Sequence, residues 1–218
     1  MQIPLEVINL SKIYDDKEAV KNISFKVNKN EIIGILGPNG CGKTTTIGMI
    51  LGLLKPTSGK VLINGIEIEK KRVDLLNNLN FISPYIELPK KLTVKQNLIV
   101  YGKLYDVKNL TSKIEYLSEK LRLGEIINKI TGELSSGQKN RVSLAKSIIN
   151  DPLVLLLDEP TASLDPETGD FVRSFLEDYQ KERGTSILLA SHNMSEVERL
   201  CSSVLMMNSG SIIDQGST

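Results

Sequence analysis

Histidine, cysteine and tryptophan are scarce in this sequence of 218 residues, which has one histidine, two cysteines and no tryptophan. The cysteines, Cys41 and Cys201, are far apart in a chain too long to need a disulfide framework, so we expect reduced thiols in a cytosolic setting. A lone histidine such as His192 more often packs at a half-buried position than does chemistry. Its role therefore has to be decided from its neighbours.

The sequence also lacks a strong net charge and a long apolar run. It has 27 lysines and arginines against 26 aspartates and glutamates, and the resulting net charge of +1 makes generic attraction to nucleic acid or to an acidic membrane surface unexpected. No segment approaches the roughly 18 apolar residues of a spanning helix, and the first residues do not resemble a secretion signal. We expect any contact with a membrane to be made through a partner.

The pattern of apolar residues predicts an α/β fold. Segments rich in β-branched residues predict early strands at 3–10, 22–27 and 31–37. Asn64-Gly65 predicts a hairpin turn within residues 60–68, because both residues tolerate positive φ angles. Apolar residues at helical spacing predict helices at 43–54, 92–105, 111–123, 137–150 and 167–181.

Two later segments, 153–160 and 186–191, are continuous apolar runs typical of strands buried on both faces of a parallel sheet. Strands that alternate with helices in this way predict a parallel sheet with crossover connections. His192 directly follows the second of these strands. In open α/β sheets ligands bind at the carboxyl ends of the strands, so this position favours a functional role.

The segment GPNGCGKTT, residues 37–45, matches the phosphate-binding pattern G-x-x-x-x-G-K-[ST] between a predicted strand and a predicted helix. Glycines let the backbone N–H groups turn inward, and the helix brings its positive end to the same point. Lys43 supplies a charge for the β and γ phosphates, and the Thr44 hydroxyl suits Mg²⁺. The predicted nucleotide-binding residues are Gly37, Pro38, Asn39, Gly40, Cys41, Gly42, Lys43, Thr44 and Thr45.

This phosphate loop does not define the reaction, because kinases, GTPases and motor ATPases share it. The sequence contains no guanine-reading motif of the NKxD kind, which favours ATP. Cys41 leaves two interpretations open. It is a small residue that fits the loop, or a reactive thiol near a helix N-terminus that maleimide would modify and ATP would protect.

VLLLDEP, residues 154–160, places Asp158 and Glu159 at the end of a buried strand. Two adjacent acids after an apolar run are costly to desolvate unless a positive group lies beside them, and a magnesium ion would meet that need. We expect Asp158 to hold the ion through water, and Glu159 to orient or deprotonate the attacking water.

The segment LSSGQ, residues 134–138, lies ahead of the acidic strand, and SLD, residues 163–165, follows it. With the phosphate loop and His192, this order of motifs resembles the ATP-binding-cassette (ABC) family over essentially the whole chain. The resemblance implies that the signature residues Ser135, Ser136, Gly137 and Gln138 contact the γ-phosphate held by a second cassette in a head-to-tail dimer. It also implies that His192 is the switch histidine, that Tyr14 stacks on adenine and that Asp165 belongs to the D-loop.

The resemblance further implies a P-loop NTPase fold with a mixed or parallel sheet, an N-terminal antiparallel β region and a helical subdomain. We expect a single domain over 1–218. Within it, 1–83 and 151–218 would form the RecA-like core with the antiparallel region, and about 84–150 the helical subdomain with the signature.

The implied function is the ATP-hydrolysing subunit of a transporter, more in the manner of exporters, with ATP and Mg²⁺ as cofactors. Its partners would be a second copy or a related cassette and separate transmembrane subunits, which would place it on the inner face of the cell membrane. A soluble ATPase acting on ribosomes or DNA, and a membrane regulator that moves no solute, remain alternatives.

Two positions depart from the family pattern. Pro84 stands where relatives have a glutamine that contacts Mg²⁺ and the lytic water, and proline has no side-chain donor or acceptor. Two alternatives are open: Ser83 substitutes for the glutamine, or this loop only couples to a partner; slow turnover is expected. Ser136 replaces a glycine of the signature and adds a small hydroxyl side chain, from which we expect a modest effect.

Overall fold

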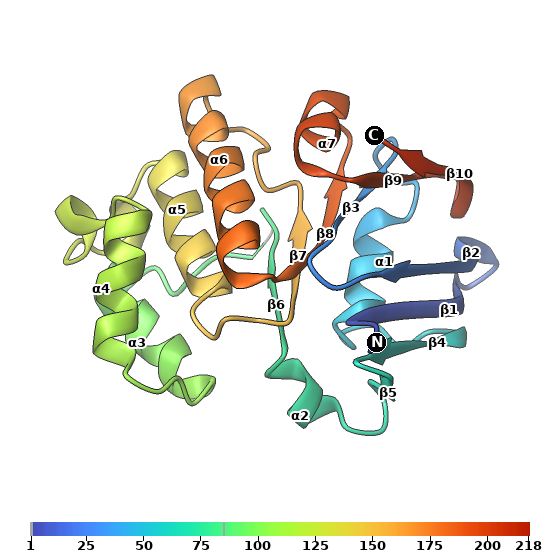
Figure 1. The fold of residues 1–218 in the computed structure, drawn as a ribbon, viewed down its shortest axis with the longest axis horizontal. Coiled ribbons are helices and arrows are strands. Elements are labelled where there is room, and N and C mark those ends of the chain that lie inside the picture. The colour runs from blue at the N-terminus through green and yellow to red at the C-terminus, as the bar shows by residue number, and fades with distance from the viewer. Residues whose placement is uncertain (1, 85) are drawn as a thin grey trace.

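The computed structural model describes residues 2–84 and 86–218, and within these ranges the chain forms two sheets with helices around them (Figure 1). The larger sheet has six strands among the described residues. Their order is β10 (Ser211–Ser217), β9 (Ser203–Asn208), β3 (Ile32–Leu36), β8 (Ser186–Ser191), β7 (Val154–Asp158) and β6 (Leu79–Ile82). All neighbours in this sheet are parallel except β10 and β9, which are antiparallel. This confirms the predicted α/β fold.

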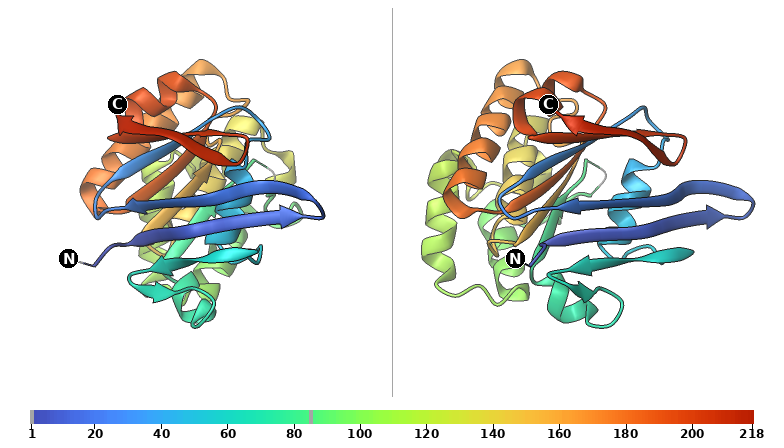
Figure 2. Two further views of the ribbon diagram at one scale, coloured as in Figure 1. Left: turned by 90° about the vertical axis from the view of Figure 1, so that its right-hand side faces the viewer. Right: turned by 45° about the vertical axis from the view of Figure 1, so that its right-hand side comes forward.

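The smaller sheet is antiparallel and lies beside the larger one in the views of Figure 2. Its strands are β2 (Lys17–Val27), β1 (Leu5–Tyr14), β4 (Ser58–Ile63) and β5 (Ile66–Glu67). The hairpin at Asn64-Gly65 is confirmed, since both residues have positive φ angles, 52° and 78°. The predicted strand bounds 3–10 and 22–27 were too short. Tyr14 pairs with Lys17 across the turn, so the two strands extend beyond the apolar segments that predicted them.

The predicted middle helices are present and lie together on the opposite side of the large sheet from the smaller sheet (Figure 1). They are α3 (Val94–Leu104), α4 (Leu110–Lys120) and α5 (Ser136–Ser147), with short 3-10 turns at Gly124–Ile126 and Thr131–Glu133. The other helices of the described residues are α1 (Lys43–Ile50), α2 (Arg72–Leu76), α6 (Pro166–Arg183) and α7 (Met194–Leu200). In no part of these described ranges is a helix both long and apolar enough to cross a membrane.

The large sheet separates two apolar cores. Leu155 and Leu157 of β7 face the core formed with the helices, whereas Val154 and Leu156 face the core shared with α1 and the small sheet. All four side chains are buried, which is the reason why this segment is apolar at every position. The carboxyl ends of β3, β7 and β8 therefore lie on a rigid, doubly covered sheet, and the polar residues that follow these strands gather at one edge.

Candidate nucleotide site

The loop between β3 and α1 has the backbone shape that its sequence predicts. A Cβ atom on Gly37 would lie 2.1 Å from the carbonyl oxygen of Met207, so a side chain has no room there. Gly42 has a φ of 114° and precedes α1, whose first turn is capped by no side chain. The N–H groups at the start of this helix are therefore oriented for an anion.

Lys43 is only 5% exposed, and its ammonium group is folded back onto the loop. It donates hydrogen bonds to the carbonyl oxygens of Gly37, at 2.7 Å, and Pro38, at 3.2 Å. A carboxylate oxygen of Glu159 lies 3.8 Å from the same nitrogen. The charge of Lys43 is thus held over the loop by weak acceptors that phosphate oxygens are able to replace.

Cys41 also lies within this loop, and its side chain is buried, with 3% exposed. Its sulfur lies 2.7 Å from the point where a Cβ on Gly37 would be, so it fills the inside of the loop. This packing supports the interpretation of Cys41 as a small structural residue.

Asp158, at the end of β7, is 1% exposed and faces hydroxyl groups from two other elements. The Thr44 hydroxyl donates to its Oδ2 at 3.1 Å, and the Ser83 hydroxyl, just after β6, lies 3.4 Å from the same atom. Burial raises the pKa of the Asp158 carboxyl, and the charge of Glu159 raises it further, while the hydrogen bonds from Thr44 and Ser83 and the charge of Lys43 lower it. The carboxylate thus lies in a place that favours a cation beside it.

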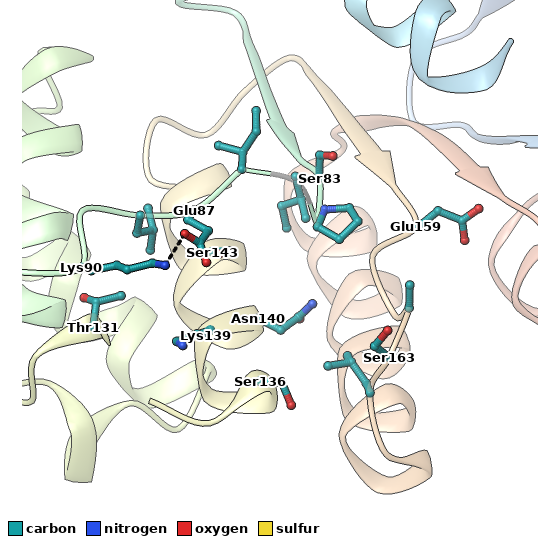
Figure 3. A pocket seen from close by; sticks show the side chains of 16 residues that line it. Ser83, Glu87, Lys90, Thr131, Ser136, Lys139, Asn140, Ser143, Glu159 and Ser163 are labelled. Atoms are coloured by element: carbon teal, nitrogen blue, oxygen red, sulfur yellow. Dashed lines mark ion pairs between the residues drawn. The ribbon is translucent and has the colours of Figure 1, made fainter. Parts of the chain in front are cut away.

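Glu159 has an unusual main chain. Its φ is 50°, a left-handed conformation that non-glycine residues rarely adopt, and its N–H donates to the carbonyl oxygen of Ala190 at 2.9 Å. This turn points the Glu159 side chain away from α5 (Figure 3) and towards His192. The Nδ1 atom of His192 lies 2.8 Å from both carboxylate oxygens.

The signature residues form the start of α5. Ser135 and Gln138 make a capping box, in which the Ser135 hydroxyl accepts from the Gln138 N–H at 3.3 Å and the Gln138 side chain accepts from the Ser135 N–H at 3.1 Å. A Cβ on Gly137 would lie 3.2 Å from Thr168 of α6, so a close helix contact also requires this glycine. Ser136 is exposed.

A cavity of about 300 Å³ lies beside this site, between the end of β6, the first half of α5 and the loop after β7 (Figure 3). Pro84, Ser136 and Glu159 are among its lining residues, and its outer part carries the ion pair of Lys90 with Glu87 at 2.7 Å. The cavity therefore joins the loop with the unusual proline to the signature and to the acidic strand end.

Two other predicted residues lie outside this cluster of contacts. Asp165 is the N-cap of α6 and accepts from the Thr168 N–H at 2.9 Å, and this hydrogen bond lowers the pKa of its carboxyl. Tyr14 is 43% exposed at the end of β1, with the Lys12 ammonium 4.9 Å from its ring centroid. Their roles in a D-loop and in adenine stacking stay predictions.

Further polar residues that the sequence did not predict lie behind the site. Glu196 of α7 accepts hydrogen bonds from Thr161, in the loop that carries Glu159, and from Ser191, the last residue of β8, which precedes His192. The pattern Asn193-x-x-Glu196 is typical of a helix start, and Asn193 does cap α7. That pattern would have predicted the helix, but not the residues to which the Glu196 side chain bonds.

Fold and site together define a P-loop nucleoside triphosphatase, and comparison with known proteins makes the class specific. The family model described as ABC transporter matches residues 20–162. The ABC transporter ATP-binding protein NatA of Bacillus subtilis is 34% identical over 97% of this chain and 89% of its own length. The Nod factor export ATP-binding protein I of Rhizobium etli is 36% identical over 97% of this chain and 67% of its own length.

Among solved structures, cbiO1 from Clostridium perfringens, described as part of the ABC transporter complex cbiONQ, superposes with a TM-score of 0.86. It is 31% identical, and the match covers all of this chain and 89% of that one. The chain belongs to the ABC transporter family, as an ATP-binding subunit with ATPase activity.

Proposed function

We propose that this subunit hydrolyses magnesium-bound ATP between two head-to-tail cassettes and that the closing and reopening of this pair drives export through separate transmembrane subunits. The observation that carries the proposal is the convergence of four groups at one sheet edge. Thr44 and Asp158 are joined at 3.1 Å, and Glu159 and His192 at 2.8 Å, beside the uncapped start of α1.

The residues present fit a magnesium ion. The oxygens of Thr44, Asp158 and Ser83 are the hard ligands that Mg²⁺ prefers, and the raised pKa of Asp158 reflects a carboxylate that gains from a nearby positive charge. Thr44 would bind the ion directly and Asp158 through water. When bound, the ion would neutralise charge on the β and γ phosphates.

The chain's own residues supply the remaining chemistry. On nucleotide binding the Lys43 ammonium group would exchange its hydrogen bonds to the loop carbonyls for bonds to phosphate oxygens. This would also free Glu159 from its ion pair with Lys43, now at 3.8 Å. Glu159 would then orient the attacking water and accept its proton, while His192 holds the Glu159 carboxylate and contacts the γ-phosphate. Tyr14 would stack on the adenine ring.

A second cassette, either another copy or a relative, would supply its signature to the same phosphates. The start of α5 offers Ser135, Ser136, Gly137 and Gln138 at a helix N-terminus, where the helix dipole favours an anion. Ser136 is exposed there, as are Pro38, Asn39 and Gly40 of the phosphate loop. Two copies arranged head to tail would bury both surfaces around one nucleotide, with Asp165 near the shared face.

The membrane partner would dock at the cavity next to Pro84. Apolar residues of this loop, including the 47% exposed Ile86, adjoin the charged Glu87 and Lys90. Glu159 and Ser136 also line the cavity, so movement of a docked segment would change the positions of residues at the hydrolytic site. Export is the favoured direction because relatives named for Nod factor export are among the most similar. The chain would then lie on the inner face of the cell membrane.

The test of this proposal is the behaviour of Glu159→Gln. This variant should bind ATP and Mg²⁺ normally and accumulate as an ATP-bound dimer, measured by sedimentation velocity with and without nucleotide. Glu182→Gln, a change of an exposed acid on α6, is the matched control and should turn ATP over without accumulating a dimer. A Glu159→Gln variant that hydrolyses ATP at the normal rate would contradict the proposed role.

Copurification identifies the transport partner. A multi-span membrane protein should copurify with the subunit in detergent, and substitution of Ile86 by aspartate should abolish this copurification without loss of nucleotide binding. Recovery of ribosomal RNA or DNA in place of a membrane protein would instead support a soluble mechanical ATPase.

A further inference from the structure

Glu196 is a carboxylic acid almost completely enclosed by the protein, with 2% of its surface exposed. It lies in the first turn of α7, and its two oxygens have different partners. The Thr161 hydroxyl donates to Oε1 at 2.6 Å, and the Ser191 hydroxyl donates to Oε2 at 2.7 Å. These are short hydrogen bonds of the kind that form between a hydroxyl and an ionised carboxylate.

The partners of Glu196 lie next to the two residues of the hydrolytic pair in the sequence. Thr161 lies two residues after Glu159, and Ser191 directly precedes His192. A single buried side chain thus joins the loop after β7 to the last residue of β8. The Glu159–His192 contact of 2.8 Å is made between the residues that follow these same two strands.

The hydrogen-bond inventory explains why a carboxylate is needed at this position. The Ser191 oxygen accepts a hydrogen bond from the Asn193 N–H at 3.1 Å, and its O–H donates to Glu196 at 2.7 Å. Thr161 is likewise a donor, and only an ionised carboxylate offers one acceptor oxygen to each. A glutamine offers one acceptor and one NH₂ group, which would leave one of the hydroxyl protons without a partner.

We infer that Glu196 is a positioning residue for hydrolysis: it fixes the two loops so that Glu159 and His192 remain in contact. The inference rests on the proposed roles of that pair. Without Glu196 the loops would separate while the phosphate loop, Lys43 and Thr44 stay in place. The effect should therefore fall on kcat and leave the KM for ATP nearly unchanged. We expect a loss of about 10- to 100-fold, the range found for residues that orient metal ligands in other enzymes.

The lone histidine provides a direct readout, because no other histidine contributes NMR signals that overlap with those of its imidazole ring. The experiment compares Glu196→Gln, Thr161→Val and Glu159→Gln with the wild-type subunit, by ATPase kinetics and by the His192 imidazole signal in the absence of nucleotide. Glu196→Gln and Thr161→Val should each lower kcat and displace or broaden the imidazole signal. Thr161→Val removes one hydroxyl at nearly constant volume and serves if Glu196→Gln does not fold.

Arg199→Met is the control for general damage to α7. Arg199 lies on the same helix but pairs with Asp170 and Glu177 of α6, away from the two loops. It should lower the unfolding temperature and leave kcat and the imidazole signal unchanged. If Glu196→Gln and Thr161→Val behave like Arg199→Met, the inference is overturned, and if Glu159→Gln also retains turnover, the proposed function fails with it.

Discussion

Lys146 is a buried lysine between the helices and the large sheet, and its charge should lower the stability of the folded protein. It lies on α5 with 8% of its surface exposed, and burial lowers the pKa of its ammonium group from 10.5 to about 8. Its Nζ donates to Asn80 of β6 at 3.0 Å and lies 4.8 and 5.3 Å from the ring centroids of Phe81 and Tyr101. Among the described residues no carboxylate pairs with this charged group, which lies where β6, α3 and α5 meet.

The perturbation is Lys146→Met, which keeps the length and removes the charge. The fall in pKa from 10.5 to about 8 corresponds to a penalty of about 3 kcal/mol for keeping the charge buried. Loss of the hydrogen bonds from Nζ to Asn80 Oδ1 and to the Phe81 carbonyl oxygen, at 3.0 and 3.4 Å, offsets about 1 kcal/mol each. Asn80 Oδ1 still accepts from the Phe81 N–H at 2.9 Å after the change. We therefore expect the variant to be more stable than wild type by about 1 kcal/mol at pH 7.

The difference in stability between the wild-type protein and Lys146→Met should depend on pH. Below pH 8 the lysine is charged in both states, so the full penalty is present in the folded state. Between pH 8 and 10.5 the folded state loses its proton first, and the stability of the wild-type protein rises relative to the variant. Urea unfolding at several pH values from 7 to 10.5 measures this difference.

The control for this experiment is Lys120→Met, a change of a half-exposed lysine whose pKa is raised by its pairing with Glu182. Its effect on stability should be nearly constant from pH 7 to 10. A Lys146→Met effect that is equally constant, or a loss of several kcal/mol at pH 7, would refute the reasoning.

Three further substitutions test the site. His192→Ala should keep ATP binding but lower turnover by about 100-fold or more, measured by phosphate release, and unchanged turnover would remove His192 from the mechanism. Asp158→Asn should raise the unfolding temperature of the nucleotide-free protein at pH 7, because the raised pKa of Asp158 means that its ionised form destabilises the folded state. In acid the carboxyl is protonated in both the folded and the unfolded protein, so the gain should vanish. A gain that persists in acid would contradict this cause. Ser83→Ala should increase the Mg²⁺ concentration needed for half-maximal turnover while metal-free ATP binding is unchanged, and an unaltered Mg²⁺ dependence would exclude a role for this hydroxyl.

Much of the core of the fold was predictable because its signals are local. The apolar run before Asp158 identified β7 without reference to any other segment, and the glycines around Lys43 identified the phosphate loop. The strand β9, the strand β10 and the helix α7 were not predicted. β9 and β10 lie at one edge of the sheet, where β9 adds in parallel to β3, and this pairing is not visible in a short stretch of sequence.

The candidate site was predictable as a set of residues but not as a set of contacts. The motifs identified Glu159 and His192, whereas their separation of 2.8 Å depends on the left-handed main chain of Glu159. Ser83, after β6, bonds to Asp158, which is 75 positions away in the sequence. Glu196, in α7, bonds to Thr161, which is 35 positions away. Such pairings follow from strand order and helix docking, which no local pattern encodes.

In the proposed dimer each ATP is bound by the phosphate loop of one cassette and by the signature residues of the other. The most direct measurement is the specific ATPase activity over a range of protein concentrations that spans the transition from monomer to dimer, with the association state followed by sedimentation. Activity per subunit should fall towards zero as the protein is diluted into monomers. Constant activity per subunit in samples that contain only monomers would contradict it.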